Sequence, residues 1–500
     1  MALALAGILT VGCLSGCGGK GGNNQSRGEG SDVEISAFIS GMGEEWLKNV
    51  VEAFNKEYPE YNAFYKPTAS WTGATSTLGM EDGDTVDLYL ATNWTDTSVL
   101  EPLDDVLDSK AKGESKTIRE KFNPSYLELE TRTDGSVYSL TYGAGGLGFV
   151  YNLDLFQKAG ITQVPRTSDE LAAVCATLKD KGITPMLHHK GGQYYMSFDE
   201  VWIAQAMGKE AFDDLYTYPT KEKLAKKDGR YDMLRAMSKI ITPDYIVAGS
   251  NTESHTVMQT KFLAGEAAMA VNGSWLQNEM GGFGDANFLM MKTPVISSIK
   301  NRLTTIKNDQ ALREVIDAVD AVTDGDKAET DYKDGDNYKV GELSVSASDW
   351  KEVKMARNSY VSADFSSTAF MPKYSANKEG AKEFLRFLYS DKGLQIYAEA
   401  THLPLPLELD NGEYDMKEWT SFEKNQYKLR QDAELYVSSD KKSNNTHDLY
   451  VNGGAVILNI VYPVNMCTLS EGQRQTAEEF WNTYIKELDS NYSTWEANIK

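Results

Sequence analysis

The folded part of the chain opens with a strand, a turn and an amphipathic helix, and this order strongly constrains the fold. Val33 to Ser40 reads as a strand, and Gly41-Met42-Gly43 follows it as a turn. Apolar residues then recur at helical spacing between Glu44 and Tyr58, at Trp46, Leu47, Val50, Val51 and Phe54. A strand that feeds a helix in this way predicts a parallel sheet covered by helices, which is an α/β fold.

Further strand and helix units follow, and a group of glycines lies between them. Thr85 to Ala91 reads as a strand, and Thr167-Ser168-Asp169-Glu170 matches a capping box at the start of a helix. A chain of 500 residues is expected to form two or more domains. Glycines 143, 145, 146 and 148 lead into the apolar run that ends at Tyr151, which suits a backbone hinge between domains.

Composition excludes some partners and favours others. Acidic residues outnumber basic ones by 73 to 50, and the formal net charge of −23 repels phosphate backbones, so nucleic acid is not expected as a partner. The 27 Tyr, 17 Phe and 9 Trp suit a protein that binds a flat, hydroxylated molecule. No phosphate loop, dinucleotide fingerprint or metal motif is present, so no cofactor or metal is expected.

The N-terminal segment indicates export. Residues 1–16 form a short apolar run with small residues, which is typical of a signal peptide. Leu14-Ser15-Gly16-Cys17 resembles a bacterial lipobox, which predicts lipidation of Cys17; Cys13 is a poorer alternative. Residues 17–31 are rich in Gly, Asn and Ser and read as a flexible tether to the membrane. Cys175 and Cys467 are expected to be buried thiols, with a disulfide as the alternative.

Four segments in the same order carry a family resemblance. They are Phe54 to Pro59, Gly146 to Gly160 with Pro165-Arg166-Thr167, Lys261 to Trp275, and Ser375 to Ser390. With these segments the chain resembles the extracellular solute-binding proteins of ABC importers, in the carbohydrate-binding group related to maltose-binding protein. The resemblance spans roughly residues 33–406 and leaves out residues 296–350 and the stretch after 406.

The resemblance implies a fold of two α/β lobes joined by hinge strands that cross between them more than once, the type II periplasmic-binding-protein-like fold. Residues 32–143 plus 288–367 are expected to form lobe one, and residues 144–287 plus 368–500 lobe two. Residues 296–350 are expected to be an acidic insert within lobe one. Asp324 to Asn337 within it contains Asp-Gly-Asp twice but lacks the spacing and closing Glu of a calcium loop, so a solvated acidic loop is expected.

The same resemblance implies a sugar site between the lobes. Aromatic rings cover the C–H face of a pyranose, while carboxylates and amides bind its hydroxyl rim. The candidate ligand-binding residues are Trp275, Trp94, Asn93, Glu45, Trp71, Tyr195, Asp364 and Tyr142. Trp46 and Trp202 fit helical apolar stripes and are expected to be core residues.

The expected function is therefore capture of a sugar or oligosaccharide and its delivery to the transmembrane permease subunits of an ABC importer. The protein is expected to be a monomer, anchored by lipid to the outer face of the cell membrane. No catalytic residue is expected. Two alternatives stay open: the same fold binding a peptide or polyamine, and an exported glycoside hydrolase, which would need two carboxylates about 5–10 Å apart across the sugar.

Overall fold

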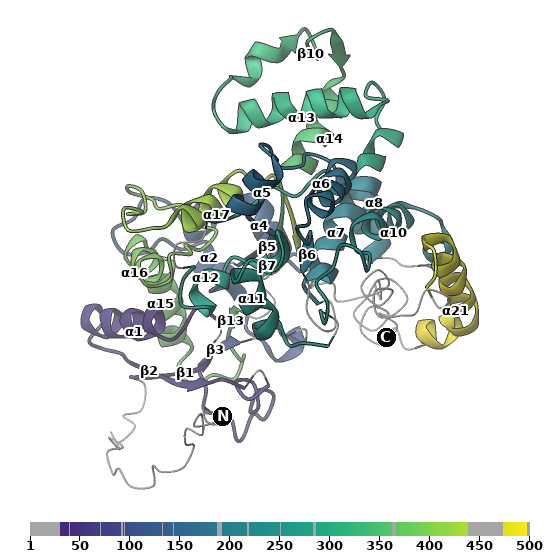
Figure 1. Cartoon of the computed structure of the whole chain (residues 1–500). Helices are drawn as coiled ribbons and strands as arrows, with labels where there is room; N and C mark the ends of the chain where they lie inside the picture. Colours follow the sequence, from purple (N-terminus) through teal and green to yellow (C-terminus); the bar gives the residue numbers. More distant parts are fainter. Residues whose placement is uncertain are drawn as a thin grey trace, which may run out of the picture.

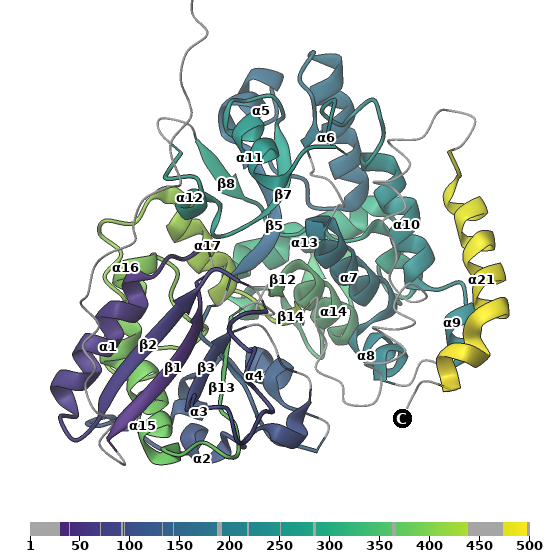
Figure 2. The ribbon, with the colours of Figure 1, turned by 90° about the horizontal axis from the view of Figure 1, so that it is seen from below.

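The computed structural model is shown in Figure 1 and, from below, in Figure 2. It describes residues 31–39, 41–70, 72–91, 94, 96–132, 134–143, 145–187, 193–217, 220–250, 252–283, 287–362, 367–438 and 474–497. The predicted signal peptide, Cys17 and nearly all of the tether lie outside these residues, and so does Cys467. Within them, no helix has the length and apolar character needed to cross a membrane.

The first lobe is built on a sheet with the strand order β2-β1-β3-β13-β4. These strands are β1 (Asp32–Phe38), β2 (Asn62–Thr68), β3 (Leu88–Ala91), β4 (Leu140–Thr141) and β13 (Thr368–Phe370). The strand β1 pairs in parallel with β2 and β3, as the opening strand and helix predicted, whereas β13 is antiparallel to its neighbours. The helices α1 (Glu45–Glu57), α15 (Lys378–Leu388) and α16 (Asp391–Thr401) pack beside this sheet (Figure 2).

The second lobe is built on a sheet with the order β14-β12-β5-β7-β6, in which β8 also pairs with β5. Its strands are β5 (Gly146–Asn152), β6 (Met186–Leu187), β7 (Met269–Gly273), β8 (Phe288–Met290), β12 (Ser359–Ser362) and β14 (Leu435–Ser438). The helices α6 (Ser168–Asp180), α7 (Gln193–Met207) and α10 (Gly229–Ile240) contribute to its core. Trp202 and Cys175 are fully buried there, and Cys175 is a free thiol.

The remaining elements are short or lie at the periphery. They are η1 (Thr97–Val99), α2 (Asp104–Leu107), α3 (Ile118–Lys121), α4 (Pro124–Glu130), α5 (Leu153–Ala159), α8 (Lys209–Thr217), α9 (Lys221–Ala225), α11 (His255–Leu263), α12 (Leu276–Glu279), η2 (Ser297–Asn301), α17 (Ser421–Gln431) and α21 (Ala477–Ala497). The helix α21 packs Trp481 and Leu488 into the core of the second lobe beside α9 and α10 (Figure 2).

The chain passes between the two sheets at two places that were predicted and one that was not. It leaves the first sheet after β4 and enters the second at β5, and it leaves the second after β12 and enters the first at β13. The crossing predicted near residue 288 is wrong, because β8 pairs with β5 of the second sheet. Residues 288–362 therefore lie with the second lobe, whereas they were predicted in lobe one. The helices α15 and α16 lie with the first lobe, whereas they were predicted in lobe two. The chain returns to the second sheet through α17 and β14.

The insert is a folded unit that packs on the second lobe and not on the first. It contains α13 (Asp309–Thr323), η3 (Glu329–Tyr332), the three-stranded sheet of β9 (Lys333–Asp334), β10 (Asn337–Val340) and β11 (Leu343–Val345), and α14 (Ala347–Arg357). Figure 1 shows these elements projecting from the second lobe. Leu312, Val315 and Val319 are fully buried, and the Trp350 ring stacks on Tyr338 with centroids 4.3 Å apart. The acidic stretch from Asp324 to Asn337 is largely exposed, as expected, although η3 and β9 lie within it.

Candidate functional site

The two sheets meet where the glycine group separates β4 from β5. The amide of Gly146 donates to Ser274 Oγ at 3.0 Å, and the amide of Ser274 donates to the carbonyl of Gly146 at 2.9 Å. On the first-lobe side, the amide of Tyr142 donates to the carbonyl of Ser367 at 2.9 Å. These bonds place the end of β7, which carries the Gly-Ser-Trp motif, directly beside the passage between the lobes.

Trp275 lies at this junction, packed against the second-lobe core. It occupies the N-cap position of α12, and its ring is partly buried. A Cβ added to Gly145 or Gly273 would lie 2.8 Å or 2.3 Å from ring atoms of Trp275, so both glycines are required for the ring to sit where it does. A Cβ on Gly41, in the turn after β1 of the first lobe, would lie 3.6 Å from Trp275 Cδ1. The predicted ring therefore packs against the second-lobe core and lies next to the first-lobe turn that contains Gly41.

Polar contacts hold the short helix α12 to α16 of the first lobe and to α17, which packs on β8 of the second lobe. Asn278 Nδ2 donates to the carbonyl of Thr401 at the end of α16, at 2.9 Å. Gln277 Nε2 donates to Glu423 Oε1 at 2.7 Å, and the same carboxylate oxygen lies 3.1 Å from Nδ1 of His402. Since Glu423 is only 6% exposed, these bonds are shielded from water. The helix that carries Trp275 is thus held from both lobes.

Glu45 and Tyr142 differ in how the structure places them. Glu45 is exposed in the first turn of α1, just after the turn that contains Gly41. Tyr142 is 1% exposed, its ring stacks on Trp46 at 5.5 Å, and its hydroxyl donates to the carbonyl of Phe38 at 3.3 Å. Burial raises the pKa of Tyr142 well above its ordinary value. Tyr142 is therefore buried in the core of the first lobe, and its role in ligand binding stays a prediction.

Trp94 follows β3 in the first lobe and is partly buried beside a small apolar cluster. Its carbonyl accepts a hydrogen bond from Arg132 Nη2 at 3.0 Å. The indole Nε1 is buried and has no hydrogen-bond partner among the described residues. An unpaired buried donor costs about 1–3 kcal/mol, so a movement that exposes it to a hydroxyl group would be favourable.

The other candidates cannot be placed as side chains. Asn93, Trp71 and Asp364 lie outside the described residues, and so does the lipidation candidate Cys17. Tyr195 lies in α7, and at this residue the structure describes the backbone but not the side chain. These residues stay predictions.

Sequence reasoning missed several residues of the junction. Ser274 lies within the Gly-Ser-Trp motif, but its role in joining β5 to β7 needs the pairing of these strands, which are more than 120 residues apart. Gln277 and Asn278 were passed over because α12 is too short for a periodic pattern. Glu423 lies in the stretch after residue 406, where its capping box with Thr420 was the available signal.

Comparisons with known proteins agree with this two-lobed arrangement. A family model described as "Bacterial extracellular solute-binding protein" matches residues 40–395. A binding protein of Brucella abortus (strain 2308) is 25% identical over 254 residues, which cover 47% of this chain and 56% of that protein. The chain thus spans about half the length of the curated relatives it matches.

Solved structures resemble the chain over nearly its whole length. The bacterial solute receptor AcbH, described as having an exclusive substrate preference for β-D-galactopyranose, superposes with a TM-score of 0.62 at 13% identity, covering 92% of this chain and 99% of AcbH. RafE from Streptococcus pneumoniae superposes in its apo form with a TM-score of 0.60 at 15% identity, covering 94% of this chain and 99% of RafE. RafE has also been solved in complex with raffinose. At these identities the likeness concerns the fold alone.

Proposed function

Because the chain belongs to the family of bacterial extracellular solute-binding proteins, we propose that it captures a sugar or oligosaccharide between its lobes and delivers it to the permease subunits of an ABC importer. The family and the two-lobed α/β fold predicted from the sequence are confirmed. The observation that carries the proposal is the position of Trp275, a ring presented by the second lobe against the first-lobe turn that contains Gly41.

The chemistry of the junction favours a sugar over other solutes. The ring of Trp275 is suited to cover the C–H face of a pyranose, and the exposed carboxylate of Glu45 begins the helix next to Gly41. The unpaired Nε1 of Trp94 offers a donor for a hydroxyl group once it is exposed. The sugar ligands named for AcbH and RafE support this choice.

Function requires lobe closure and no bond breaking. A solute that touches both lobes favours the closed arrangement, because it binds that state more tightly than the open one. The passages between β4 and β5 and between β12 and β13 are the hinges, and the glycines of the first passage supply the backbone freedom. The bond from Gln277 to Glu423 of α17 holds the helix of Trp275 on the second-lobe side, whereas the bond from Asn278 to Thr401 reaches α16 of the first lobe.

The proposal also covers the place of the protein in the cell. Lipidation at Cys17 and a tether up to residue 31 would hold the protein at the outer face of the cell membrane, where the permease lies. Two acyl chains give durable attachment where one gives only marginal binding. Mass spectrometry of the membrane-extracted protein, compared with a Cys17→Ser variant, tests this part; a Cys17→Ser protein that stays in the membrane fraction contradicts it.

The central experiment is a titration of the purified chain with galactose, raffinose and a longer oligosaccharide, read by calorimetry and by thermal shift. A bound sugar raises the melting temperature by linkage. Trp275→Ala is expected to weaken binding at least tenfold, about 1.4 kcal/mol, and Trp275→Phe to weaken it less. Trp481→Phe, a change in α21 away from the junction, is the matched control and leaves the affinity unchanged.

The two alternatives give different outcomes in the same experiment. Binding of a peptide or polyamine with no response to any sugar would identify another solute. Release of shorter saccharides during incubation would identify a glycoside hydrolase and refute the proposed function.

A further inference from the structure

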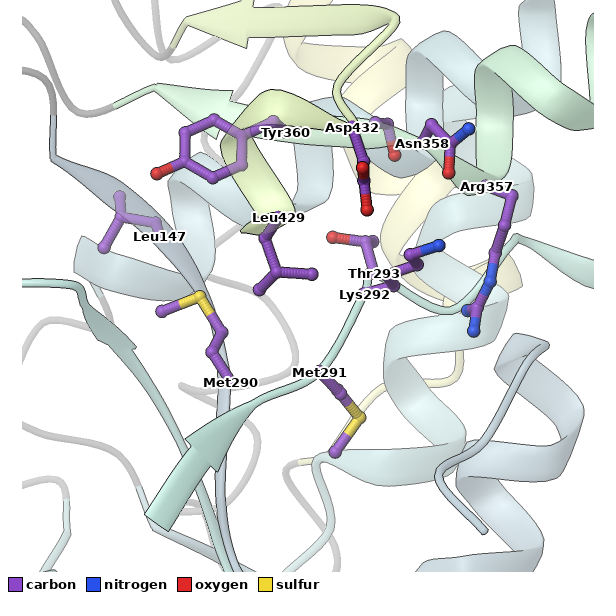
Figure 3. Close-up of a pocket in the computed structure, with 11 residues that line it drawn as sticks. Leu147, Met290, Met291, Lys292, Thr293, Arg357, Asn358, Tyr360, Leu429 and Asp432 are labelled. Atoms are coloured by element: carbon purple, nitrogen blue, oxygen red, sulfur yellow. The ribbon is translucent and has the colours of Figure 1, made fainter. Parts of the chain in front are cut away.

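A small cavity lies in the second lobe beside the strands that lead to the lobe crossings (Figure 3). It has a volume of about 20 Å³. Leu147 of β5, Met290 of β8, Tyr360 of β12 and Leu429 of α17 form its apolar side. The opposite side is polar, with Lys292, Thr293, Arg357, Asn358 and Asp432. None of these residues is a candidate for the sugar site.

Two residues that line this cavity each carry a buried polar atom that has no partner among the described residues. Arg357 is 3% exposed, and its Nη1 makes no hydrogen bond although Nε and Nη2 both donate to Asp320 at 2.9 Å. Asn358 is 4% exposed, and its Oδ1 accepts none although Nδ2 donates to Thr323 Oγ1 at 3.1 Å. Each unpaired atom costs about 1–3 kcal/mol unless something fills the cavity.

The charges around the cavity are already balanced. Lys292 Nζ donates to Asp320 Oδ1 at 3.2 Å, and the same carboxylate also accepts from Arg357. Lys428 Nζ donates to Asp432 Oδ2 at 2.7 Å. An anion would gain the donor on Arg357 but would face the oxygen of Asn358, and a cation would face the guanidinium. The cavity therefore favours a neutral ligand.

Size and hydrogen bonding select that ligand. A water needs about 10–15 Å³ of such space and two to four polar partners. This cavity has about that room for one molecule. It offers one unpaired donor on Arg357, one unpaired acceptor on Asn358 and, among its lining residues, the hydroxyl-bearing side chain of Thr293.

We propose that the cavity binds a single ordered water, which accepts from Arg357 Nη1 and donates to Asn358 Oδ1. This water lies where three parts of the protein meet and connects two of them by hydrogen bonds. Arg357 ends α14 of the insert, Asn358 precedes β12, and Asp432 and Leu429 belong to the end of α17. The insert is thereby attached to the strand and helix that lead toward the lobe crossings.

A crystal structure of the whole chain at high resolution tests the proposal. The expected result is one peak within 3.2 Å or so of both atoms, refined as water, with no anomalous signal after a bromide soak. Asn358→Leu is expected to remove the peak. Thr293→Val, which keeps the shape of the side chain, serves as the milder variant if Asn358→Leu does not fold, and it is expected to lower the occupancy.

Three outcomes would overturn the proposal. An empty cavity in the unchanged chain would show that both atoms stay unpaired or that the side chains rearrange. A bromide peak would identify an anion site. A peak that persists unchanged in Asn358→Leu and in Thr293→Val would show that these atoms do not hold the water.

Discussion

Lys121→Met removes the positive charge from the buried ion cluster that Lys121 forms with Glu114 and Asp391 in the first lobe. The Lys121 side chain is 0% exposed, and its Nζ donates to Glu114 at 2.6 Å, to Asp391 at 2.8 Å and to the carbonyl of Tyr389 at 3.0 Å. The cluster joins α3 to the start of α16. Met fills a similar volume, so the change isolates the loss of the charge and its hydrogen bonds.

The expected cost follows from burial. The Glu114 side chain is 5% exposed and that of Asp391 is 20% exposed, so both carboxylates stay largely shielded after their partner is gone. Breaking a buried ion pair on one side costs about 3–5 kcal/mol. That free energy corresponds to a melting temperature lower by roughly 6–20 °C for a lobe of this size. Lys417→Met, whose side chain is 83% exposed, is the control and costs less than about 1 kcal/mol.

The pH dependence gives a second readout. Burial opposes ionisation of Asp391, but hydrogen bonds from Lys121 and from backbone amides of Asp410 and Asn411 outweigh it and hold the pKa of Asp391 below its ordinary value. A lowered pKa stabilises the fold above the unfolded-state value of 3.8, and that contribution is lost as the pH falls through the folded-state pKa. The difference between Lys121→Met and the unchanged chain should therefore narrow below about pH 4.

Urea unfolding followed by circular dichroism at pH 7 and at lower pH values measures both effects. The reasoning is refuted if Lys121→Met stays within about 1 kcal/mol of the unchanged chain at pH 7. A difference that grows as the pH falls would also refute it, because protonation of Asp391 must relieve part of the penalty.

Three further changes test the junction and the insert. Gly145→Ala places a Cβ 2.8 Å from the ring of Trp275, so overpacking of about 1–3 kcal/mol should displace the ring and weaken sugar binding, measured by calorimetry. Glu423→Gln removes the carboxylate that faces Gln277, and it should lower the free energy of unfolding by about 1.5–3 kcal/mol in urea titrations. An unchanged free energy of unfolding would show that the bond from Gln277 to Glu423 does not stabilise the protein. Trp350→Ala should cost about 3–5 kcal/mol and make the insert the first site of limited proteolysis, whereas a protease-resistant insert would contradict its packing.

Local sequence patterns were sufficient for most of the individual elements. The apolar stripe from Trp46 to Phe54 is buried as predicted, because helical spacing alone determines which face of α1 must leave water. Thr167 caps α6 through a bond from the amide of Glu170, since capping depends on residues within one turn. Trp275 could be named from a local motif, and the glycines before β5 identified the first passage between the lobes.

Pairing between distant segments was decided only in three dimensions. The strands β12 and β13 are short and buried and lie fewer than ten residues apart, yet they join different sheets. Their composition does not specify which sheet they join, so the sequence could not assign residues 288–362 and the helices α15 and α16 to the correct lobes. For the same reason Tyr142 could be predicted as a ring near the hinge, whereas its stacking on Trp46 depends on how α1 packs across the sheet. The sequence by itself determined the elements, the family and the aromatic candidate at the junction. The tertiary structure decided to which lobe each element belongs. Periodicity in the sequence indicates which residues are buried, whereas only the packing of the elements determines which residues they are buried against.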